Sequence, residues 1–184
     1  TIYSIKSNAN NFEAFIKTIF EDEEIEKHGF KQTRDYILLK QMGIDLNNIR
    51  FDLEVGAYIL NPANNKYTIE MLSKEYLNMD LADYLQVEQQ ESQEQINLFD
   101  TQTEEADKSE IETNALYTYC IYKLAEVVNK KLEETNTLEL FKTIDMPTVE
   151  VLSNMQWNGM YLSVDELEEY GKEIKEKVDS LTKE

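Results

Sequence analysis

Glycine and proline are scarce in this chain, and their scarcity limits the folds that it can adopt. Only five of the 184 residues are glycine and two are proline. These residues supply the special backbone conformations of tight turns, so a fold built from many short hairpins is disfavoured. Because 41% of the residues are hydrophobic, the chain can form one cored domain, or one domain and a piece of another. We expect it to be rich in helix.

Acidic residues dominate the charged ones, with 37 Asp and Glu against 18 Lys and Arg and a formal charge of −19. A general phosphate-binding surface needs lysine and arginine, so this balance argues against one but leaves room for a local site of carboxylates and metal ions. Cys120 is the only cysteine, which excludes an intrachain disulfide and a cysteine zinc site. No segment approaches the length of an apolar membrane span, and the N-terminal residues lack the layout of a signal peptide, so we expect neither. We therefore expect a cytoplasmic protein with no membrane partner.

Local patterns predict the order of helices and strands. Alternation of apolar and polar residues predicts strands at 2–6, 27–31 and 49–53. Cap residues and amphipathic spacing predict helices that begin after Asn11 and Thr33, helices at 54–60 and 68–77, a long helix at 108–133, a helix opened by Pro147, and a last one opened by Ser163. Gly43 and Gly159 are expected to end two of them.

Two further segments carry expectations of their own. Residues 80–108 are predicted to form a flexible acidic loop, since nine acidic residues and one lysine lie between positions 88 and 112. Its apolar island at 96–99 is expected to fold back on its own domain, with docking on a partner as the alternative. In the last helix the apolar residues are spaced by 3, 4, 4 and 3, a stripe that needs a partner helix: Leu167, Tyr170, Ile174, Val178 and Leu181.

Asp52 and Glu54 form a D-x-E pair at the end of a predicted strand. Metal-dependent nucleases use such pairs, because two carboxylates can share two divalent ions. Residues 76–80 and 161–165 both match Y-x-x-x-D, which could complete a site of this kind. In a chain with 37 acidic residues these short patterns also arise by chance, and we favour that interpretation.

Other candidate residues point to structure rather than chemistry. His28, the only histidine, has no serine or cysteine nearby that resembles a nucleophile, so we expect it at the surface or beside a helix. Tyr117, Tyr119 and Tyr122 could suggest base stacking. Because no basic residues alternate with them, we expect these tyrosines to pack in the core.

Two stretches of the sequence carry a family resemblance. Residues 28–62 (HGFKQTRDYILLKQMGIDLNNIRFDLEVGAYILNP) resemble the middle of the 3′–5′ exonuclease domain of bacterial DNA polymerase I, a family A polymerase. Residues 140–181 resemble the junction with the polymerase domain, whose pattern E-x-P-L-x-x-V-L-x-x-M-E-x-x-G-V-x-V-D is matched by DMPTVEVL at 145–152 and MQWNGMYL at 155–162.

This resemblance implies an α/β, ribonuclease H-like exonuclease fold, in which helices flank a mixed sheet. The first strands of that sheet would precede residues 2–6 and are expected to be missing from this chain. Residues 1–143 would form the exonuclease-like domain, including the loop at 80–108. Residues 144–184 would begin the polymerase domain with its first thumb helix.

The resemblance also locates the positions of the exonuclease site. Active members of the family hold two metal ions with four acidic residues in three motifs, and the first motif would precede residues 2–6. Asp52 and Glu54 then fall on a later element that is structural in the family. In the second motif, N-x-x-x-D, Lys31 takes the Asn position and Asp35 the Asp position. In the third, Y-x-x-x-D, Glu110 takes the Tyr position and Asn114 the Asp position.

These substitutions imply a domain that has lost its proofreading chemistry. Asn114 offers a neutral amide where the mechanism needs a carboxylate, and Lys31 places a cation near the metals. Glu110 lacks the phenol that would orient the attacking water. We therefore expect a catalytically inactive segment with a structural role, without a cofactor of its own, in a polymerase of DNA replication and repair.

The parent polymerase is expected to use Mg²⁺ in its polymerase domain, to bind DNA and to be associated with the nucleoid, whereas this segment would bind nucleic acid weakly. One alternative is an active proofreading exonuclease that holds Mg²⁺ or Mn²⁺ with Asp35 and some of Asp52, Glu54 and Asp107. Another is an independent acidic adaptor that binds partners through residues 96–99 or the last helix.

Overall fold

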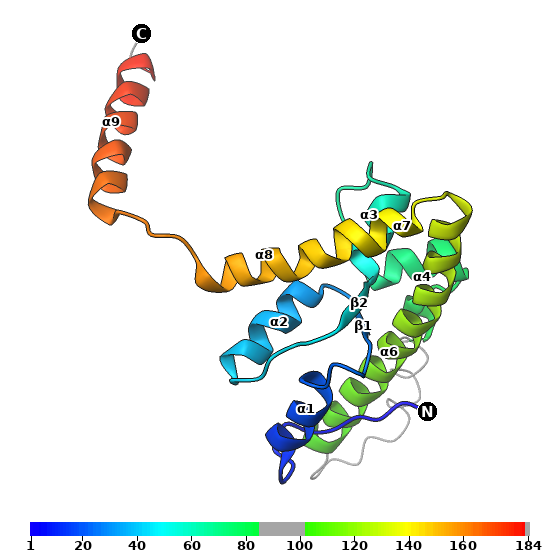
Figure 1. Ribbon diagram of the computed structural model, residues 1–184. Helices are drawn as coiled ribbons and strands as arrows, with labels where there is room; N and C mark the ends of the chain where they lie inside the picture. Colours follow the sequence, from blue (N-terminus) through cyan, green and yellow to red (C-terminus); the bar gives the residue numbers. More distant parts are fainter. Residues whose placement is uncertain (85–101, 183–184) are drawn as a thin grey trace. The chain divides into compact units, whose positions relative to one another are not determined.

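The computed structural model describes residues 1–84 and 102–182, with the side chains of residues 102–109 left out. The chain divides into two compact units, Thr1–Ser153 and Asn154–Glu184. The first unit contains, in order, α1 (Phe12–Phe20), β1 (Lys27–Gly29), α2 (Gln32–Gln41), β2 (Ile49–Asp52), α3 (Leu53–Leu60), α4 (Ile69–Leu77), α6 (Gln102–Glu134), α7 (Leu138–Leu140) and the π-helical turn η1 (Phe141–Asp145) (Figure 1). Helix α8 (Met146–Asn158) begins in the first unit and ends in the second, which also contains α9 (Val164–Thr182).

Strands β1 and β2 form a two-stranded parallel sheet, the one sheet found in the described part of the chain. Lys27 aligns with Ile49 and His28 with Phe51, so the register shifts by one residue between the two pairs. Parallel neighbours need a crossover connection, and α2 lies in that connection. The strands predicted at 27–31 and 49–53 are thus confirmed with slightly shorter bounds.

The main core lies where α6 packs against α3 and α4. Leu124, Val128 and Leu132 on α6 are fully buried there. Gly56 on α3 permits the close approach of the two helices, since a Cβ atom at this position would lie 2.9 Å from Val128 Cγ1. The ring of Phe51 on β2 lies 5.2 Å from that of Phe141, which joins the sheet to η1.

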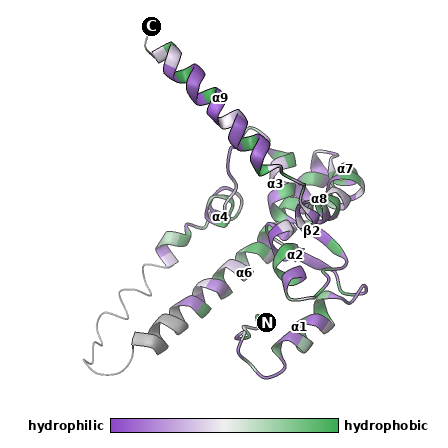
Figure 2. Cartoon of the chain, turned by 90° about the vertical axis from the view of Figure 1, so that its left-hand side faces the viewer, coloured by the Kyte–Doolittle hydropathy of each residue, from purple (hydrophilic) through white to green (hydrophobic). Residues whose placement is uncertain are grey.

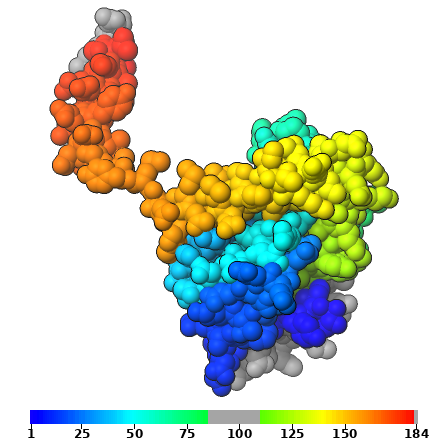
Figure 3. All heavy atoms as spheres, viewed as in Figure 1, coloured from blue at the N-terminus to red at the C-terminus, as the bar shows by residue number. Residues whose placement is uncertain are grey.

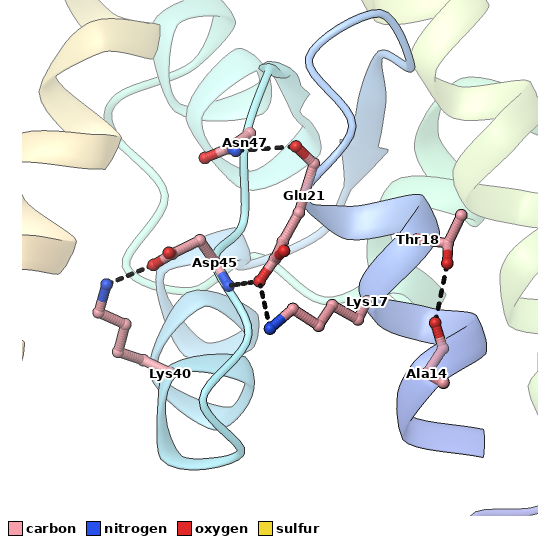
Figure 4. Close-up of polar contacts among 7 residues, drawn as sticks. All are labelled: Ala14, Lys17, Thr18, Glu21, Lys40, Asp45 and Asn47. Atoms are coloured by element: carbon pink, nitrogen blue, oxygen red, sulfur yellow. Dashed lines mark hydrogen bonds and ion pairs between the residues drawn. The ribbon is translucent and has the colours of Figure 1, made fainter. Parts of the chain in front are cut away.

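A second apolar cluster joins α1 to α2 and to the segment that leads into β2; its buried members are Ile16, Tyr36, Leu39, Ile44 and Leu46. Polar contacts at its edge centre on Glu21 (Figure 4). The Glu21 carboxylate accepts a hydrogen bond from the Asp45 N–H at 3.3 Å and pairs with Lys17 at 3.5 Å. The Asn47 side-chain amide donates to the Glu21 carbonyl at 2.9 Å. These contacts connect the end of α1 to residues 45–47.

Several predicted helix ends are confirmed. Asn11 immediately precedes α1 as predicted, but its side chain makes no capping hydrogen bond. Thr68 precedes α4, where its Oγ1 accepts a hydrogen bond from the Met71 N–H at 3.2 Å. Gly43 and Gly159 follow α2 and α8 with φ angles of 72° and 66°, left-handed values that suit glycine at a helix end.

The strand predicted at residues 2–6 is wrong. These residues are exposed and belong to no strand, and the first part of the chain lies at the surface (Figure 3). Alternation of apolar side chains forms a strand only when a neighbour supplies backbone hydrogen bonds. In the described part of the chain β1 and β2 pair with each other, and neither pairs with this segment.

Thr33 does not cap α2, which begins one residue earlier, at Gln32. A side chain distant in the sequence takes over the capping role, because Asp52 accepts hydrogen bonds from the backbone N–H groups of Gln32 and Lys31 at 2.7 and 3.4 Å. Lys31 precedes the helix with a φ of 62°. Local sequence carries no signal for this contact.

Pro147 does not open a helix, because α7, η1 and α8 follow one another without interruption. A proline within a helix lacks an N–H and crowds the carbonyl four residues earlier. Directly before Pro147 the helix widens into the π turn, in which the Met146 N–H donates to the Phe141 carbonyl. This wider turn accommodates the proline ring.

Two of the three tyrosines predicted in the core are instead exposed. Tyr119 and Tyr122 keep 43% and 61% of their surface accessible, and Tyr117 donates a hydrogen bond to Glu70 Oε1 at 2.7 Å.

The loop predicted at residues 80–108 is in part helical, because the long helix α6 begins at Gln102. Leu81, at the other end of that stretch, is buried, and residues 85–101 with the apolar island lie outside the described residues.

No helix in the described ranges is both long enough and apolar enough to cross a membrane. The Cys120 thiol is buried on α6, and burial raises its pKa above the ordinary value.

Candidate functional site

Lys31 and Asp35, the two positions of the predicted second motif, lie at the start of α2 and face different neighbours. Lys31 Nζ lies 3.5 Å from Glu54 Oε1 and 5.2 Å from the centre of the Phe30 ring. Burial raises the pKa of the Glu54 carboxyl, while the nearby Lys31 cation acts in the opposite direction. The sequence therefore places an ammonium group beside one member of its D-x-E pair.

Asp52, the other member of that pair, is buried and serves as an anchor for two helices. Its Oδ1 atom accepts hydrogen bonds from the N–H groups of Glu54 and Val55 at 2.8 and 3.4 Å, at the start of α3. The remaining two bonds come from Lys31 and Gln32 at the start of α2. Burial raises the pKa of the Asp52 carboxyl, and the four backbone donors oppose this shift. Both oxygens thus have structural partners.

Asp35 lines a cavity of about 1100 Å³ between the sheet, α2, α6 and the start of α8. Partial burial within the cavity wall raises the pKa of its carboxyl to about 6, although the side chain still reaches solvent; Arg34 opposes the shift and Asp52 adds to it. His28 on β1 lines the same cavity, half exposed and 3.5 Å from Glu26. This position agrees with the prediction of a surface histidine.

One face of α6 forms the opposite wall of this cavity, through Thr118, Ile121, Tyr122, Ala125, Glu126 and Asn129. Glu110 and Asn114, the predicted third-motif positions, are exposed on α6 and are not among the lining residues. The structure therefore places Asp35 in one cavity wall without bringing Glu110 or Asn114 into it. The side chain of Asp107 lies outside the described residues.

The described donors do not fit the pair of metal ions that active members of the resembled family hold. Among the side chains that the structure describes, no group of three or more His, Cys, Asp or Glu residues could hold a metal ion. Asp52 has backbone partners, Glu54 faces an ammonium group, and Asp35 lies in the cavity with two basic side chains, Arg50 and Lys142, among its lining. These side chains therefore do not provide the donor set of a two-metal site.

The two Y-x-x-x-D segments form no common site with Asp52. In the first, Asp80 pairs with Lys74 at 2.6 Å, and the Tyr76 ring lies 5.5 Å from Lys131 Nζ. The second, residues 161–165, belongs to the other compact unit.

Gln32 is a buried residue of this region that the sequence does not reveal. Its side-chain amide donates to the Phe51 carbonyl at 2.6 Å, so it fixes the start of α2 to β2. No local pattern marks such a glutamine. The spacing of the cavity-lining residues on α6 is the one signal that could have identified that wall, because positions three and four apart share a helix face.

Lys31 and Glu54 line a second, smaller pocket of about 550 Å³. Lys66, Tyr58 and Tyr67 also line it. The two tyrosine rings meet edge to face with their centres 6.4 Å apart. The pocket therefore combines two ammonium groups, one of them paired with the Glu54 carboxylate, with aromatic surface.

Comparison with known families decides how the chain is classified. The family model described as "DNA polymerase I, ribonuclease H-like domain" matches residues 1–92, which is half of the chain. The chain belongs to this family. The resemblance read from residues 28–62 and 140–181 is confirmed, and so is the ribonuclease H-like α/β fold.

Curated relatives of the family are similar over most of this chain. DNA polymerase I of Bacillus subtilis is 27% identical over 154 residues, which cover 84% of this chain and 17% of the relative. The Helicobacter pylori enzyme is 28% identical over 163 residues, with coverages of 88% and 16%. The Geobacillus stearothermophilus enzyme is 24% identical, with coverages of 87% and 17%. The chain thus spans less than a fifth of the length of these relatives.

A solved structure supports the fold of this DNA polymerase I family member. It is the "POL domain of Pol1 from M. smegmatis complex with DNA primer-template and dNTP", which aligns with a TM-score of 0.72 and 17% identity. The alignment covers 94% of this chain and 26% of that one. At this identity the likeness concerns the fold alone.

Proposed function

We propose that this chain is a catalytically silent exonuclease-like segment of a DNA polymerase I that acts in DNA replication and repair. In this proposal residues 1–143 are the exonuclease-like domain and have a structural role, and residues 144–184 begin the polymerase domain. The family membership and the similarity to DNA polymerase I over 84% of the chain support it.

The observation that carries the proposal is the separation of the expected site residues. Asp35 lies in the large cavity, whereas Glu110 and Asn114 are exposed on α6 and do not line it. Two-metal catalysis stabilises charge with several carboxylates that converge on one point. A single convergent aspartate, with the lysine of the same motif paired to Glu54 at 3.5 Å, does not supply that charge.

The parent polymerase, rather than this segment, would carry out the chemistry. We expect Mg²⁺ and the primer-template to be bound by its polymerase domain; the related Mycobacterium structure is described with DNA primer-template and dNTP. The segment itself would contact single-stranded DNA weakly. The smaller pocket suits such a contact through Lys66 and the exposed ring of Tyr58, because ammonium groups attract phosphates and aromatic rings stack on bases, while the Glu54 carboxylate in its lining keeps the contact weak. Cytoplasmic, nucleoid-associated localisation would follow from the parent enzyme.

The alternative, an active 3′–5′ proofreading exonuclease, depends on Asp35 and further carboxylates. Of its candidates, Asp52 has four backbone donors and Glu54 faces Lys31. This alternative predicts metal-dependent degradation of single-stranded DNA that requires Asp35.

A nuclease assay separates the two functions. The 184-residue chain would be incubated with end-labelled single-stranded DNA and Mn²⁺, beside an Asp35→Asn variant and an active family member as the positive control. We expect no release of mononucleotides above that of the Asp35→Asn variant. Release that requires Mn²⁺ and disappears in Asp35→Asn would overturn the proposal.

A further inference from the structure

The smaller pocket, which Lys31 and Glu54 line, gathers its polar and aromatic groups from three segments of the first unit. Lys31 directly precedes α2, Glu54 lies in the first turn of α3, and residues 64–67 belong to the loop after that helix. The hydrophobic helix α3 gives way there to a hydrophilic stretch at residues 61–66 (Figure 2). Charged and aromatic side chains therefore meet in one pocket of about 550 Å³.

Tyr58 offers aromatic surface at this pocket. It lies on α3 and keeps 54% of its surface accessible. The ring of Tyr67 meets it edge to face, with the ring centres 6.4 Å apart. Tyr67 is buried, and its hydroxyl donates to the Asn61 carbonyl at 2.6 Å. Because Tyr67 is fixed in this way, it holds the Tyr58 ring in place as a surface on which a base can stack.

Lys31 is held in a backbone conformation that lysine seldom adopts. Its φ angle of 62° lies in the left-handed region, which side chains other than those of Asn, Asp and His rarely enter. Its backbone N–H donates to Asp52 Oδ1 at 3.4 Å. Residues in such strained conformations cluster at binding sites, because the surrounding structure must hold them there. The backbone therefore fixes the point from which the Lys31 ammonium group reaches the pocket.

The ammonium group of Lys31 is occupied by Glu54. Lys31 Nζ lies 3.5 Å from Glu54 Oε1, and the two side chains are 42% and 37% exposed. A phosphate can therefore reach Lys31 from solvent, but it must compete with the carboxylate. If it drew Lys31 away, Glu54 would lose its counter-charge at a partly buried position, which is costly.

We propose that Glu54 is an internal competitor for phosphate, which limits how tightly the pocket binds a nucleotide unit of single-stranded DNA. The base would stack on Tyr58, and the phosphate would lie between Lys66 and Lys31. Two lysines and one glutamate give the lining a charge of +1, which becomes +2 when Glu54 is neutralised. This inference rests on the weak DNA contact of the proposed function and names the residue that limits it.

Other acidic groups act on the pocket from outside its lining. Glu70 and Glu75 lie near Lys66 and Tyr67, but Glu54 is the only carboxylate in the lining found among the described residues. The net charge of −19 repels DNA as a whole, and salt at about 0.15 M screens charges farther away than about 8 Å. At that ionic strength Glu54 should have the largest effect on phosphate binding.

Nuclear magnetic resonance titration of the ¹⁵N-labelled chain with tetradeoxyadenylate tests the site. The buffer contains about 0.15 M salt and EDTA, so that no metal-dependent cleavage can occur. We expect weak binding in fast exchange, with shifts of the amide signals of residues 64–67. Tyr58→Leu should weaken binding at least about fivefold, because stacking on the ring is lost.

Charge variants test the role of Glu54. Glu54→Gln keeps the shape of the side chain and should tighten binding about three- to tenfold, because it removes one negative charge beside the phosphate. The matched control, Glu13→Gln, removes the same charge at an exposed position on α1 outside the lining. It should change the affinity by less than about twofold. Adding Lys31→Gln to Glu54→Gln should cancel the gain, since it removes the released ammonium group.

Three results would overturn the inference: no shifts at residues 64–67, equal affinities of Glu54→Gln and Glu13→Gln, or a double variant that binds as tightly as Glu54→Gln alone. The amide spectra also verify that each variant keeps its fold. Lys66→Gln, at an exposed position of the loop, leaves the ion pair intact and should weaken binding about threefold. Because cleavage cannot occur in EDTA, these results are independent of the nuclease assay that tests catalytic silence.

Discussion

The backbone N–H of Gln32 donates a hydrogen bond to Asp52 Oδ2 at 2.7 Å, across 20 positions of the sequence. The same carboxylate caps α3 through the N–H groups of Glu54 and Val55. One buried side chain therefore accepts hydrogen bonds from the backbone N–H groups at the starts of two helices. These bonds set the positions of both helices at the end of the parallel sheet. This contact gives a structural role to Asp52, one member of an acidic pair that resembles a nuclease motif.

Replacing this carboxylate should destabilise the fold. Asp52→Ala leaves buried N–H groups at two helix starts without partners, and we expect a loss of about 3 kcal/mol in the free energy of unfolding. Urea denaturation followed by circular dichroism measures the loss. Asp83→Ala, at an exposed position, is the matched control and should change stability by less than about 0.5 kcal/mol. Equal stabilities of the two variants would contradict the anchoring role.

Gly56 should tolerate no larger side chain while Val128 is present. In Gly56→Ala the new methyl group would lie 2.9 Å from Val128 Cγ1, so α3 and α6 must separate at a cost of about 1–3 kcal/mol. Gly171→Ala on α9 meets nothing within 4 Å and should stabilise that helix by about 0.5–1 kcal/mol. Adding Val128→Ala to Gly56→Ala would relieve the clash. A neutral Gly56→Ala variant would contradict the close packing.

Asp35 should make stability depend on pH. Its pKa of about 6 in the folded chain exceeds the ordinary 3.8, so the folded state holds the proton more tightly than the unfolded state. The stabilisation from this proton is present below about pH 4 and lost as the pH rises through about 6. Relative to Asp35→Asn, the unmodified chain should therefore lose stability between about pH 4 and pH 7 in urea denaturation. A constant difference between the two across this range would contradict the raised pKa.

Local signals predicted the elements whose ends depend on neighbouring residues. Thr68 caps α4 with its own hydroxyl, and Gly43 follows α2 with a left-handed backbone; both effects act within a few positions. The predictions for the start of α2 and for a strand at residues 2–6 were wrong because each of these structures depends on contacts with residues distant in the sequence. Asp52 takes the capping role expected of Thr33, and residues 2–6 have no described strand to pair with.

The candidate site was predictable only in part for the same reason. The family resemblance predicted Asp35 as a site position, which stays a prediction; the structure shows that Asp35 lines the large cavity. The exposure of Tyr122 on the cavity side of α6 could not be inferred. The helix carries apolar residues around most of its circumference, so the sequence does not indicate which face is exposed to solvent. The Lys31–Glu54 pair joins residues 23 positions apart and had no local signature.

Binding of Mn²⁺ tests the central claim most directly. Electron paramagnetic resonance of free Mn²⁺, titrated with the chain and with Asp35→Asn, reports how many ions each protein removes from solution and how tightly. A chain with a charge of −19 should attract Mn²⁺ diffusely, so we expect weak binding that about 0.15 M salt suppresses and that Asp35→Asn leaves unchanged. A tightly bound pair of ions per chain that persists in salt and is lost in Asp35→Asn would contradict a silent site.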